Sequence, residues 1–231
     1  YAQVIADERA GKYLGKTVQI IPHVTAEVQR GILESGKGRD IQIVEIGGTV
    51  GDYESLAFLE AIRQFKHKVG QENVMYVHLV YIPYLGASKE FKTKPAQNAL
   101  RDLRETGIQA DMVMARAEAA MPKHALDKLS LLADIAPEGI VPLPNASTVY
   151  DVPLTLEAHS VAQFVATKLG LKDNKPQLDD WKKLVATIKD DTKSEVKIGV
   201  VAKYMHHEDT YTSVFEAAKA AAWAEGLRAK L

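Results

Sequence analysis

An acidic residue followed by a cluster of glycines is the first place in this chain where chemistry is expected, in the segment IQIVEIGGTVGDYES. A largely apolar run, residues 41–44, leads directly to Glu45. If that run is a strand of an open parallel sheet, its carboxyl end lies at the edge where such sheets bind ligands. A carboxylate there can hold Mg²⁺ against the phosphates of a nucleotide. The residues are equally compatible with an exposed acid at the end of a strand.

The glycines that follow this acid predict a turn that enters a helix. Gly residues between positions 47 and 51 allow positive φ angles and a close approach of the backbone to a ligand. We expect Asp52 to cap the N-terminus of a helix that starts at Tyr53. Glu54 would then lie in the first turn, where a negative charge interacts favourably with the helix dipole.

A second segment, GASKEFKTKPAQNALRDL, is rich in lysine where a helix is expected to begin. Lys89, Lys92 and Lys94 come just before Pro95, which is typical of the first helical position. Ammonium groups beside the unpaired N–H groups of a helix N-terminus make a good binding site for a triphosphate. Gln97 follows within the first turn, where its amide can hydrogen-bond a base or a ribose. On charge alone, a solvated basic loop is the more common outcome.

The motif GKYLGKT at residues 11–17 resembles the end of a phosphate-binding loop, but its spacing is wrong. Such a loop requires G-x-x-x-x-G-K-[ST], and Ala10 stands where the first glycine belongs. The preceding segment is charged and helix-like, and the following TVQIIP is typical of a strand, so the order of the elements is reversed. We interpret the motif as a surface turn before a strand.

Other catalytic chemistry has little support in these residues. There is no cysteine, which excludes a disulfide framework, a thiolate metal site and a cysteine nucleophile within the chain. No G-x-S-x-G motif occurs, and His206-His207-Glu208 lacks the spacing of a metalloprotease helix. His23 and His78 lie in or beside apolar runs, where we expect hydrogen-bonded core imidazoles.

The composition is that of a globular protein without a strong electrostatic preference. The 231 residues are 46% hydrophobic, enough for one sizeable core or for one domain and part of another. The formal net charge of -1 provides no basic field that would recruit nucleic acid. No apolar run approaches the roughly 20 residues needed to cross a bilayer, so we expect no membrane partner and a cytoplasmic location.

Apolar runs bounded by turn residues alternate with segments of helical period, which predicts an α/β fold with a mostly parallel sheet flanked by helices. The chain already begins in a helix-like segment. The predicted strands are residues 17–22, 40–46, 74–82, 111–116 and 139–143. The predicted helices are residues 25–35, 53–69, 95–106, 122–134 and 153–170.

The character of the sequence changes after residue 171. The polar stretch KDNKPQLDD indicates a linker, and an amphipathic helix carrying Trp181, Leu184 and Ile188 follows it. A new strand, VKIGVVAKY, is expected from Val196, with a helix from about residue 209 onward.

One strand and one helix cannot bury a core alone, so the last part of the sequence is interpreted as the opening of a further domain. We therefore predict three parts. They are a first domain over residues 1–171, a linker with a helix over 172–195, and the truncated start of a second domain over 196–231.

Several long blocks resemble the CTP synthase family, in its amidoligase (synthetase) domain. The similar blocks are YLGKTVQIIPHVT, VEIGGTVGDYESLAFLEAIRQ, PYLGASKEFKTKPAQNALRDLR and GIQADMVMAR, and the register continues through STVYDVP. The resemblance covers residues 1 to about 170, and the linker with VKIGVVAKY is similar to the junction with the glutaminase domain. It implies a dethiobiotin-synthetase-like P-loop α/β domain joined to a class I glutamine amidotransferase domain.

The resemblance implies a C–N ligase of pyrimidine biosynthesis that acts on UTP, ATP and glutamine-derived ammonia. ATP would phosphorylate O4 of the uracil ring, and ammonia from the glutaminase domain, arriving through a tunnel, would displace the phosphate to give CTP. Phosphorylation is needed because a ring carbonyl oxygen is a poor leaving group, and Mg²⁺ spreads the charge that builds up during transfer. The family also implies feedback inhibition by CTP and a homotetramer with the pyrimidine site between subunits.

Taken residue by residue, the resemblance implies a role for each part of the site. Glu45 matches the Mg²⁺ ligand. The pocket for CTP as inhibitor is matched by Asp52, Tyr53 and Glu54. The segment shared by UTP and CTP is matched by Lys92, Thr93, Lys94, Pro95, Ala96 and Gln97, together with Lys128. The loop that borders adenine, largely through its backbone, is matched by Pro144, Asn145 and Ala146.

The chain departs from the family pattern at some of these positions. Tyr53 stands where Ile is usual, and Ala96 stands where Thr is usual. Both touch the implied nucleotide sites, so we expect altered nucleotide affinity there. Outside those sites, Ala57 replaces a usual Pro and Lys89 a usual Gly.

The phosphate loop and the Asp partner of the Mg²⁺ site would precede Tyr1, and the glutaminase nucleophile would follow Leu231. We therefore expect these residues to be an internal fragment with no synthetase or glutaminase turnover of its own. A non-catalytic nucleotide-binding or assembly paralogue is the alternative. Another amidoligase of the same superfamily, such as one for dethiobiotin or cobyrinate synthesis, is disfavoured by KTKPAQ, a block associated with pyrimidine triphosphates.

Overall fold

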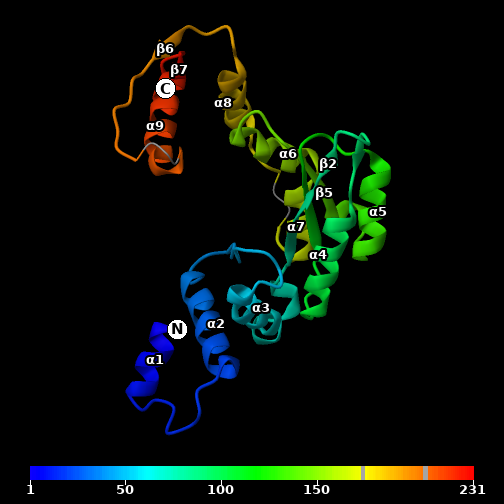
Figure 1. The fold of residues 1–231 in the computed structure, drawn as a ribbon, viewed down its shortest axis with the longest axis vertical. Coiled ribbons are helices and arrows are strands. Elements are labelled where there is room, and N and C mark those ends of the chain that lie inside the picture. The colour runs from blue at the N-terminus through cyan, green and yellow to red at the C-terminus, as the bar shows by residue number, and fades with distance from the viewer. Residues whose placement is uncertain (173–174, 205–207) are drawn as a thin grey trace. The chain divides into compact units, whose positions relative to one another are not determined.

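The computed structural model describes residues 1–172, 175–204 and 208–231, which form two compact units (Figure 1). The first unit consists of Tyr1–Asn145 with His159–Asp173, and the second of Ala146–Ala158 with Asn174–Leu231. The three-part domain division predicted from the sequence stays a prediction.

A parallel sheet is the centre of the first unit. Its strands are β1 (Val77–Ile82), β4 (Met112–Ala117) and β5 (Ile140–Pro144), in the order β1-β4-β5. The predicted strands over 74–82, 111–116 and 139–143 are therefore confirmed. Parallel neighbours need a crossover connection, and α4 (Lys94–Glu105) and α5 (Lys123–Ala133) supply the two that this sheet requires.

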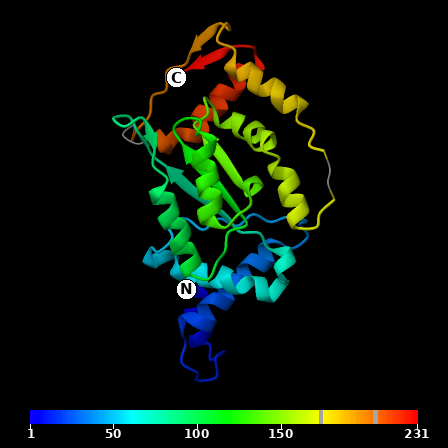
Figure 2. The same cartoon turned by 90° about the vertical axis from the view of Figure 1, so that its right-hand side faces the viewer.

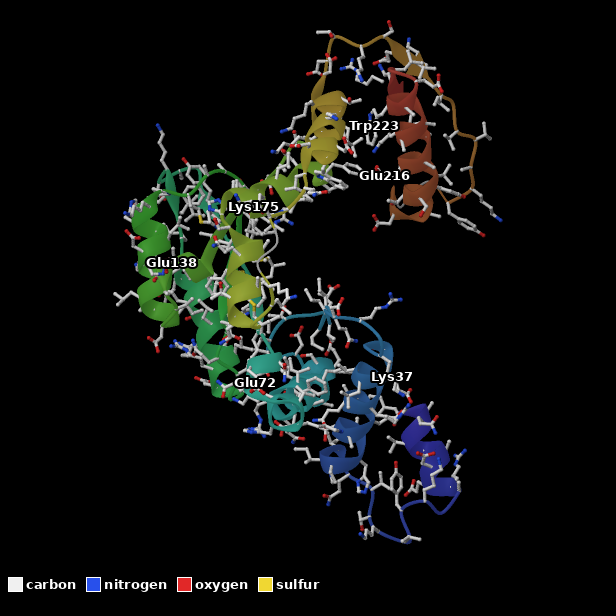
Figure 3. The ribbon with its side chains drawn as sticks, turned by 180° about the vertical axis from the view of Figure 1, so that it is seen from behind. Lys37, Glu72, Glu138, Lys175, Glu216 and Trp223 are labelled. Carbon is white, nitrogen blue, oxygen red and sulfur yellow. The ribbon has the colours of Figure 1, made fainter. Side chains whose placement is uncertain are left out.

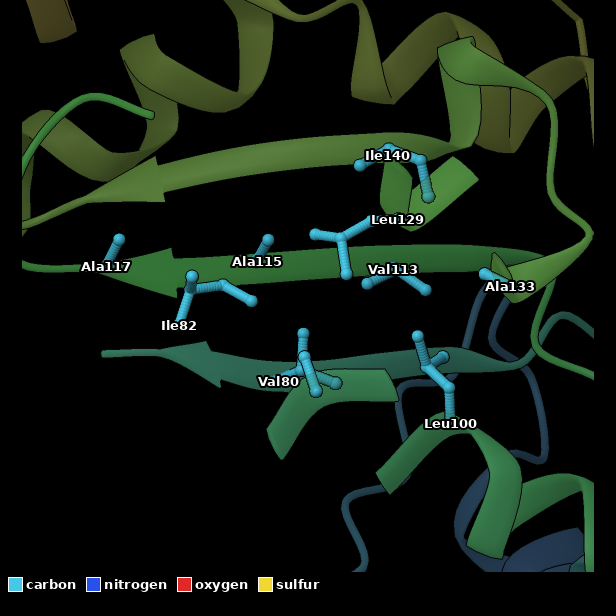
Figure 4. Packing of buried hydrophobic residues seen from close by; sticks show 10 residues of the cluster. Val80, Ile82, Leu100, Val113, Ala115, Ala117, Leu129, Ala133 and Ile140 are labelled. Carbon is cyan, nitrogen blue, oxygen red and sulfur yellow. The ribbon is translucent and has the colours of Figure 1, made fainter. Parts of the chain in front are cut away.

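One face of this sheet packs against α4 and α5 to form the main core (Figure 4). Each helix contributes a stripe of buried residues at helical spacing, such as Leu100 in α4 and Leu129 in α5. The strands contribute alternate side chains that point to the same face. The buried members of this cluster are Val80, Ile82, Ala96, Leu100, Val113, Ala115, Ala117, Leu129, Ala133 and Ile140.

The other face of the sheet is covered unevenly. Helix α7 (Val161–Lys168) lies on the side of the sheet away from α5 (Figures 1 and 2). An ion pair ties it to the start of β4, with Lys168 Nζ 2.6 Å from Asp111 Oδ1. Three apolar side chains of β1 on this face stay exposed: Val77, Leu79 and Tyr81.

The helix predicted over 153–170 is interrupted. It consists of α6 (Val152–Ala158), which belongs to the second unit, and α7, which belongs to the first. Ser160 lies between them with a φ of 54°, a left-handed conformation that a continuous right-handed helix cannot contain.

The N-terminal part of the first unit is helical. It contains α1 (Ala2–Arg9), α2 (Thr25–Ser35) and α3 (Leu56–Val69), of which α2 and α3 match the predicted helices. Short helical turns flank them: η1 (Ile20–Val24), η2 (Tyr53–Ser55) and η3 (Gln71–Asn73). Helices α2 and α3 pack together, and the buried Gln29 amide donates to the carbonyl of Ala61 at 2.9 Å.

Two predicted strands are wrong. Residues 17–22 enter the η1 turn, and residues 40–46 contain no strand, since they pair with no other segment in the part of the chain that the structure describes. Ile43 is 92% exposed as a result. The GKYLGKT motif is a turn as predicted, with Gly11 and Gly15 both at positive φ, but the strand expected after it is missing.

Short elements complete the first unit. A small antiparallel hairpin, β2 (Tyr84–Leu85) and β3 (Glu90–Phe91), connects β1 to α4. The turn η4 (Pro137–Gly139) leads into β5. Gly139 is required there, because a Cβ at this position would lie 2.6 Å from Ile135 Cγ2 and 3.0 Å from the carbonyl oxygen of Asp111.

The second unit is built from helices and one small parallel pair of strands. In addition to α6 it contains η5 (Val149–Asp151), α8 (Asp179–Lys189), η6 (Glu208–Tyr211) and α9 (Thr212–Ala224). The strands are β6 (Glu195–Lys197) and β7 (Arg228–Lys230).

The helices predicted around Trp181 and after residue 209 are confirmed by α8 and α9. The long strand predicted from Val196 to Tyr204 is wrong, because β7 offers β6 only a three-residue partner and the segment beyond it forms no ladder. No helix in the described part of the chain combines the length and apolar character needed to span a bilayer.

Candidate functional site

The carboxyl ends of the three parallel strands carry two hydrogen-bonded pairs of polar side chains. Tyr81 at the end of β1 pairs in register with Arg116 of β4, and its hydroxyl donates to Glu118 Oε1 at 3.1 Å. The Arg116 guanidinium donates to Asn145 Oδ1 at 2.8 Å, just beyond the end of β5. The hydrogen bond with Glu118 raises the pKa of the Tyr81 phenol. These contacts make the carboxyl edge of the sheet the first candidate for a ligand site.

The lysine-rich segment follows β1 at the same edge. The hairpin folds back so that the Lys92 amide donates to the carbonyl of Pro83 at 2.9 Å, and the Tyr84 and Phe91 rings pack at 5.0 Å. The Lys92 ammonium forms an ion pair with Glu90 and holds the pKa of that carboxyl below its usual range. An exposed pair of this kind is worth little by itself, so Lys92 can exchange its partner for an anionic ligand.

The side chains of residues 93–97 divide into two groups. Thr93 and Ala96 are buried, Ala96 within the main core, so only their backbone can meet a ligand. Lys94 and Pro95 are exposed in the first turn of α4. Gln97 is half-buried, and its amide donates to Thr93 Oγ1 at 2.8 Å. The segment thus presents Lys94 and the α4 N-terminus to solvent on a firmly packed base.

The remaining predicted nucleotide contacts lie on elements that start or end at this edge. Lys128 is exposed on α5, next to the fully buried Leu129. Pro144 is half-buried and Asn145 exposed at the end of β5. Ala146 is the first residue of the second unit.

Glu45 is not positioned as predicted. It is exposed, but the run before it is no strand, so no sheet presents its carboxylate at a strand end. The neighbouring Ile46 packs against the cluster of Leu59, Leu103, Ile108 and Ala110, which anchors the segment on its far side. Neither interpretation drawn from the sequence is observed in full, because Glu45 is exposed before a Gly-rich turn but does not end a strand.

The turn after Glu45 has the expected glycine conformations but a different role for Asp52. Gly48 and Gly51 adopt φ angles of 82° and 102°. The Asp52 carboxylate accepts from the Thr49 amide at 2.8 Å and makes no hydrogen bond to the helical turn that follows. The predicted side-chain cap is therefore wrong, because the carboxylate closes the preceding turn instead. Glu54 is an exposed residue of η2, and Tyr53 beside it is 91% exposed.

Donor groups that could bind Mg²⁺ are few in the described residues. In residues 1–172, 175–204 and 208–231, no group of three or more Asp, Glu or His side chains could hold a metal ion. Mg²⁺ keeps several waters and is often bound by one or two carboxylates together with substrate phosphates. The exposed Glu45 fits the role of a single protein ligand of that kind.

Neither histidine is the hydrogen-bonded core imidazole that the sequence predicted, since His23 is hydrogen-bonded outside the core and His78 lacks a partner on Nδ1. His23 Nδ1 accepts from the Gln19 amide at 3.0 Å, and its ring meets Tyr13 edge-on at 4.7 Å. His78 on β1 has a buried Nδ1 without a hydrogen-bond partner in the described structure, and burial lowers the pKa of its imidazole. The segment at 206–207 lies outside the described residues.

Sequence reasoning missed Arg116 and the Tyr81–Glu118 pair. A signal was present, because MVMARAE places a cation and an acid at the end of an apolar run where the next polar residues belong to the sheet edge. Attention to charged residues in the last two positions of each predicted strand would have found Arg116.

Comparison with known proteins agrees with the resemblance seen in the sequence. A family model described as CTP synthase N-terminus matches residues 1–171. The CTP synthase of Methanocaldococcus jannaschii is 48% identical over 217 residues, which are 94% of this chain and 40% of the relative. The CTP synthase of Rubrobacter xylanophilus is 43% identical over 231 residues, covering 100% of this chain and 42% of the relative.

A third relative, the CTP synthase of Roseiflexus sp. (strain RS-1), is 44% identical over 229 residues, 98% of this chain and 41% of its own length. The chain therefore spans about 40% of the length of the curated relatives that it matches. The matched part at residues 1–171 contains the sheet and the polar edge described above.

Proposed function

The chain belongs to the CTP synthase family, and from this premise we propose that the protein converts UTP to CTP with ATP and ammonia, as a glutamine-hydrolysing C–N ligase. ATP phosphorylates the O4 oxygen of the uracil ring, and ammonia replaces the phosphorylated oxygen at C4 and releases phosphate. The work of this part of the chain is to bind and orient two triphosphates, since the chemistry depends on position and on charge stabilisation.

The observation that carries the proposal is the set of cationic side chains at the carboxyl edge of the sheet. Lys92 and Lys94 come at the start of α4, and Lys128 lies on α5, which begins after β4. We assign them to the triphosphate of UTP, with the N–H groups of the α4 N-terminus as additional donors. The buried Thr93 and Ala96 fix the backbone of this turn, and Gln97 is assigned to the pyrimidine or ribose.

ATP is assigned to the neighbouring strand ends. Pro144, Asn145 and Ala146 border the adenine through their backbone groups. Arg116 is held by its hydrogen bond to Asn145, which supports a role for its guanidinium beside the purine or the phosphates. This arrangement would place the donor triphosphate along the strand ends that the lysines also reach.

Glu45 is proposed as the protein ligand of Mg²⁺, which supplies charge neutralisation to the transferred phosphoryl group when bound. The residues of the exposed turn, Asp52, Tyr53 and Glu54, are proposed to contact CTP as an inhibitor. A homotetramer and a glutaminase domain that supplies ammonia complete the proposal, with residues 1–171 as the synthetase domain. The proposed domain division continues with a linker at 172–195 and the start of the glutaminase domain from 196.

The test is a kinetic comparison in the full-length protein that carries this chain. UTP, ATP, Mg²⁺ and ammonium are supplied, and CTP is quantified by chromatography. We expect CTP to form, and the variants Lys94→Ala and Lys128→Ala to raise the KM for UTP about tenfold each, because each removes a phosphate contact worth roughly 1.4 kcal/mol. Lys182→Ala on α8 removes the same charge elsewhere and should leave the KM unchanged.

Two outcomes would reject the assignment. Absence of CTP from a folded full-length protein would reject the synthase activity and favour a non-catalytic nucleotide-binding paralogue. CTP formation with an unchanged KM for UTP in both lysine variants would keep the activity but reject the site.

A further inference from the structure

Arg116 lies near the end of β4, close to an acidic residue with which it does not pair. Its guanidinium donates from Nη2 to Asn145 Oδ1 at 2.8 Å. Among the described residues, Nε and Nη1 have no hydrogen-bond partner and the guanidinium forms no ion pair. The Asn145 amide is neutral, so it orients the guanidinium without compensating its charge. Arg116 is exposed, and its remaining donors are therefore accessible to a ligand.

The acidic residue is Glu118, which follows Arg116 by two positions and is also exposed. In an extended backbone, side chains two residues apart point to the same face, about 7 Å from each other along the chain. Glu90 and Lys92 have the same separation at the end of β3, and their side chains form an ion pair. This spacing therefore permits an acid and a cation to pair.

Tyr81 distinguishes the β4 segment from the β3 segment. It is the register partner of Arg116 in β1, so the two side chains are neighbours on one face of the sheet. The Tyr81 hydroxyl donates to Glu118 Oε1 at 3.1 Å. This hydrogen bond raises the pKa of the phenol, so the hydroxyl keeps its proton at neutral pH. Glu90 accepts from no side chain other than Lys92 among the described residues.

The difference matters for the binding of an anion. If Glu118 turned to Arg116, a phosphate would have to displace the carboxylate and would then lie beside its negative charge. An exposed pair of this kind corresponds to about a factor of two to five in an equilibrium constant. A guanidinium that is oriented by a neutral amide presents its planar donors to phosphate oxygens without this competition.

We propose that Tyr81 is a positioning residue of the ATP site: its hydroxyl holds the Glu118 carboxylate away from Arg116 and leaves the guanidinium available to the phosphates of ATP. The inference rests on the assignment of ATP to the strand ends proposed above. Tyr81 is assigned no nucleotide contact of its own, so its effect passes through the charge of Glu118.

The experiment is a double-mutant cycle in the full-length protein that carries this chain. Calorimetry measures the Kd for the non-hydrolysable ATP analogue AMPPNP with Mg²⁺. Tyr81→Phe should raise the Kd about threefold, because Glu118 is then free to pair with Arg116. Adding Glu118→Gln to Tyr81→Phe should restore the wild-type Kd, since an amide does not compensate the guanidinium. Glu118→Gln alone should change the Kd by less than about twofold.

Steady-state kinetics at saturating UTP and ammonium give a second readout. Tyr81→Phe should raise the KM for ATP about threefold and leave kcat and the KM for UTP unchanged, because only the free guanidinium is lost. Arg116→Ala should raise the Kd for AMPPNP about tenfold. Tyr81→Phe should have no further effect in that background.

A matched control is available in the second unit. The Tyr150 hydroxyl donates to Glu216 Oε2 at 3.2 Å, and Figure 3 labels Glu216 on α9. Lys219 already pairs with that carboxylate at 2.7 Å, so loss of the hydroxyl frees no acid to take a new cation. Tyr150→Phe should leave the Kd for AMPPNP unchanged. Circular dichroism verifies that every variant is folded.

Three outcomes would overturn the inference. They are an unchanged Kd in Tyr81→Phe, a weakened Kd that Glu118→Gln does not restore, and an equal loss in Tyr150→Phe. Failure of the folded wild-type protein to bind AMPPNP would reject both the inference and the ATP assignment. The synthase activity is scored separately by CTP formation: CTP without any effect of Tyr81→Phe rejects only the inference, and the expected cycle of Kd values without CTP rejects only the activity.

Discussion

Two segments of similar apolar character differ in structure: one is a buried strand and the other is not a strand. Residues 112–117 form β4, which pairs with β1 on one side and β5 on the other, and four of its six residues are fully buried or nearly so. Residues 41–46 have no ladder partner among the described segments, and Ile43 stands 92% exposed. The comparison teaches that an apolar run becomes a strand only where a neighbour satisfies its backbone groups.

The residues of the candidate site differ in the same way, according to the segment that carries them. The residues attached to β1, β4 and β5 are held by hydrogen bonds and by the core beneath them, as the Arg116–Asn145 bond illustrates. Glu45, attached to the unpaired segment, is exposed without comparable support. The proposed nucleotide contacts therefore divide into a fixed set at the sheet edge and one acid, Glu45, whose position the sheet does not control.

The largest effect is expected from truncating one apolar side chain in each segment. Leu129→Ala removes a fully buried side chain that packs on β4 and should lower the free energy of unfolding of the first unit by about 3 kcal/mol. Ile43→Ala should change it by less than about 0.5 kcal/mol, because the side chain is exposed. Hydrogen exchange of the β4 amides measures both, since the two tryptophans of the chain belong to the second unit. A loss from Ile43→Ala as large as that from Leu129→Ala would show that residues 41–46 are packed in solution.

A smaller effect concerns a buried side-chain nitrogen of β1 that has no hydrogen-bond partner in the described part of the chain. His78→Leu removes a buried Nδ1 without a partner and should stabilise the first unit by about 1 kcal/mol at neutral pH. Burial lowers the pKa of His78 in the folded state, so the unfolded chain binds this proton first as the pH falls. Stability should therefore be constant above about pH 6.5 and decrease below it, towards the lower folded pKa.

Thermal unfolding between pH 8 and pH 5 checks the titration. The slope attributable to this imidazole should disappear in His78→Leu and persist in His67→Leu, which replaces an exposed histidine on α3. An identical pH slope in the two variants would contradict the burial of His78 in a neutral form.

The smallest effect is expected from the ion pair that ties α7 to the sheet. Lys168→Met should cost roughly 0.5–1 kcal/mol, because Asp111 is mostly buried and would lose its partner at 2.6 Å. Lys182→Met on α8 removes a longer and more exposed pair, 3.7 Å from Asp179, and should cost nothing measurable. Urea denaturation at low and high salt measures the loss of unfolding free energy in each variant. Equal losses would show that the ion pair at the sheet stabilises no more than the ion pair on the solvated surface of α8.

The sequence was sufficient to predict the parts of the fold whose local signals agree with their surroundings. The apolar runs of β1, β4 and β5 and the apolar stripes of α4 and α5 have the hydrophobic pattern expected of strands and helices. These elements also pack against one another in the main core. The failures have physical causes. TVQIIP and IQIVEI have high strand propensity, but propensity does not show whether another segment is available to pair, and none does among the described residues. Likewise, the helical pattern of residues 153–170 does not show that Ser160 adopts a left-handed conformation.

The candidate site shows the same limit. Lysine spacing predicted an exposed basic turn before α4, which is observed around Lys94. It could not predict that Ala96 belongs to the core, or that Asp52 would close its own turn by bonding to Thr49. Which side chain faces solvent within a turn depends on packing against distant parts of the chain. The spacing of residues within a short segment does not show that packing.

The central claim is that the carboxyl edge of the β1-β4-β5 sheet binds the nucleotides. Titration of the ¹⁵N-labelled chain with UTP and Mg²⁺, followed by amide chemical shifts, tests it most directly. The account predicts saturable shifts concentrated at residues 92–97 and extending to Arg116 and Asn145. Shifts confined to the second unit, or a spectrum unchanged up to 10 mM UTP, would contradict it.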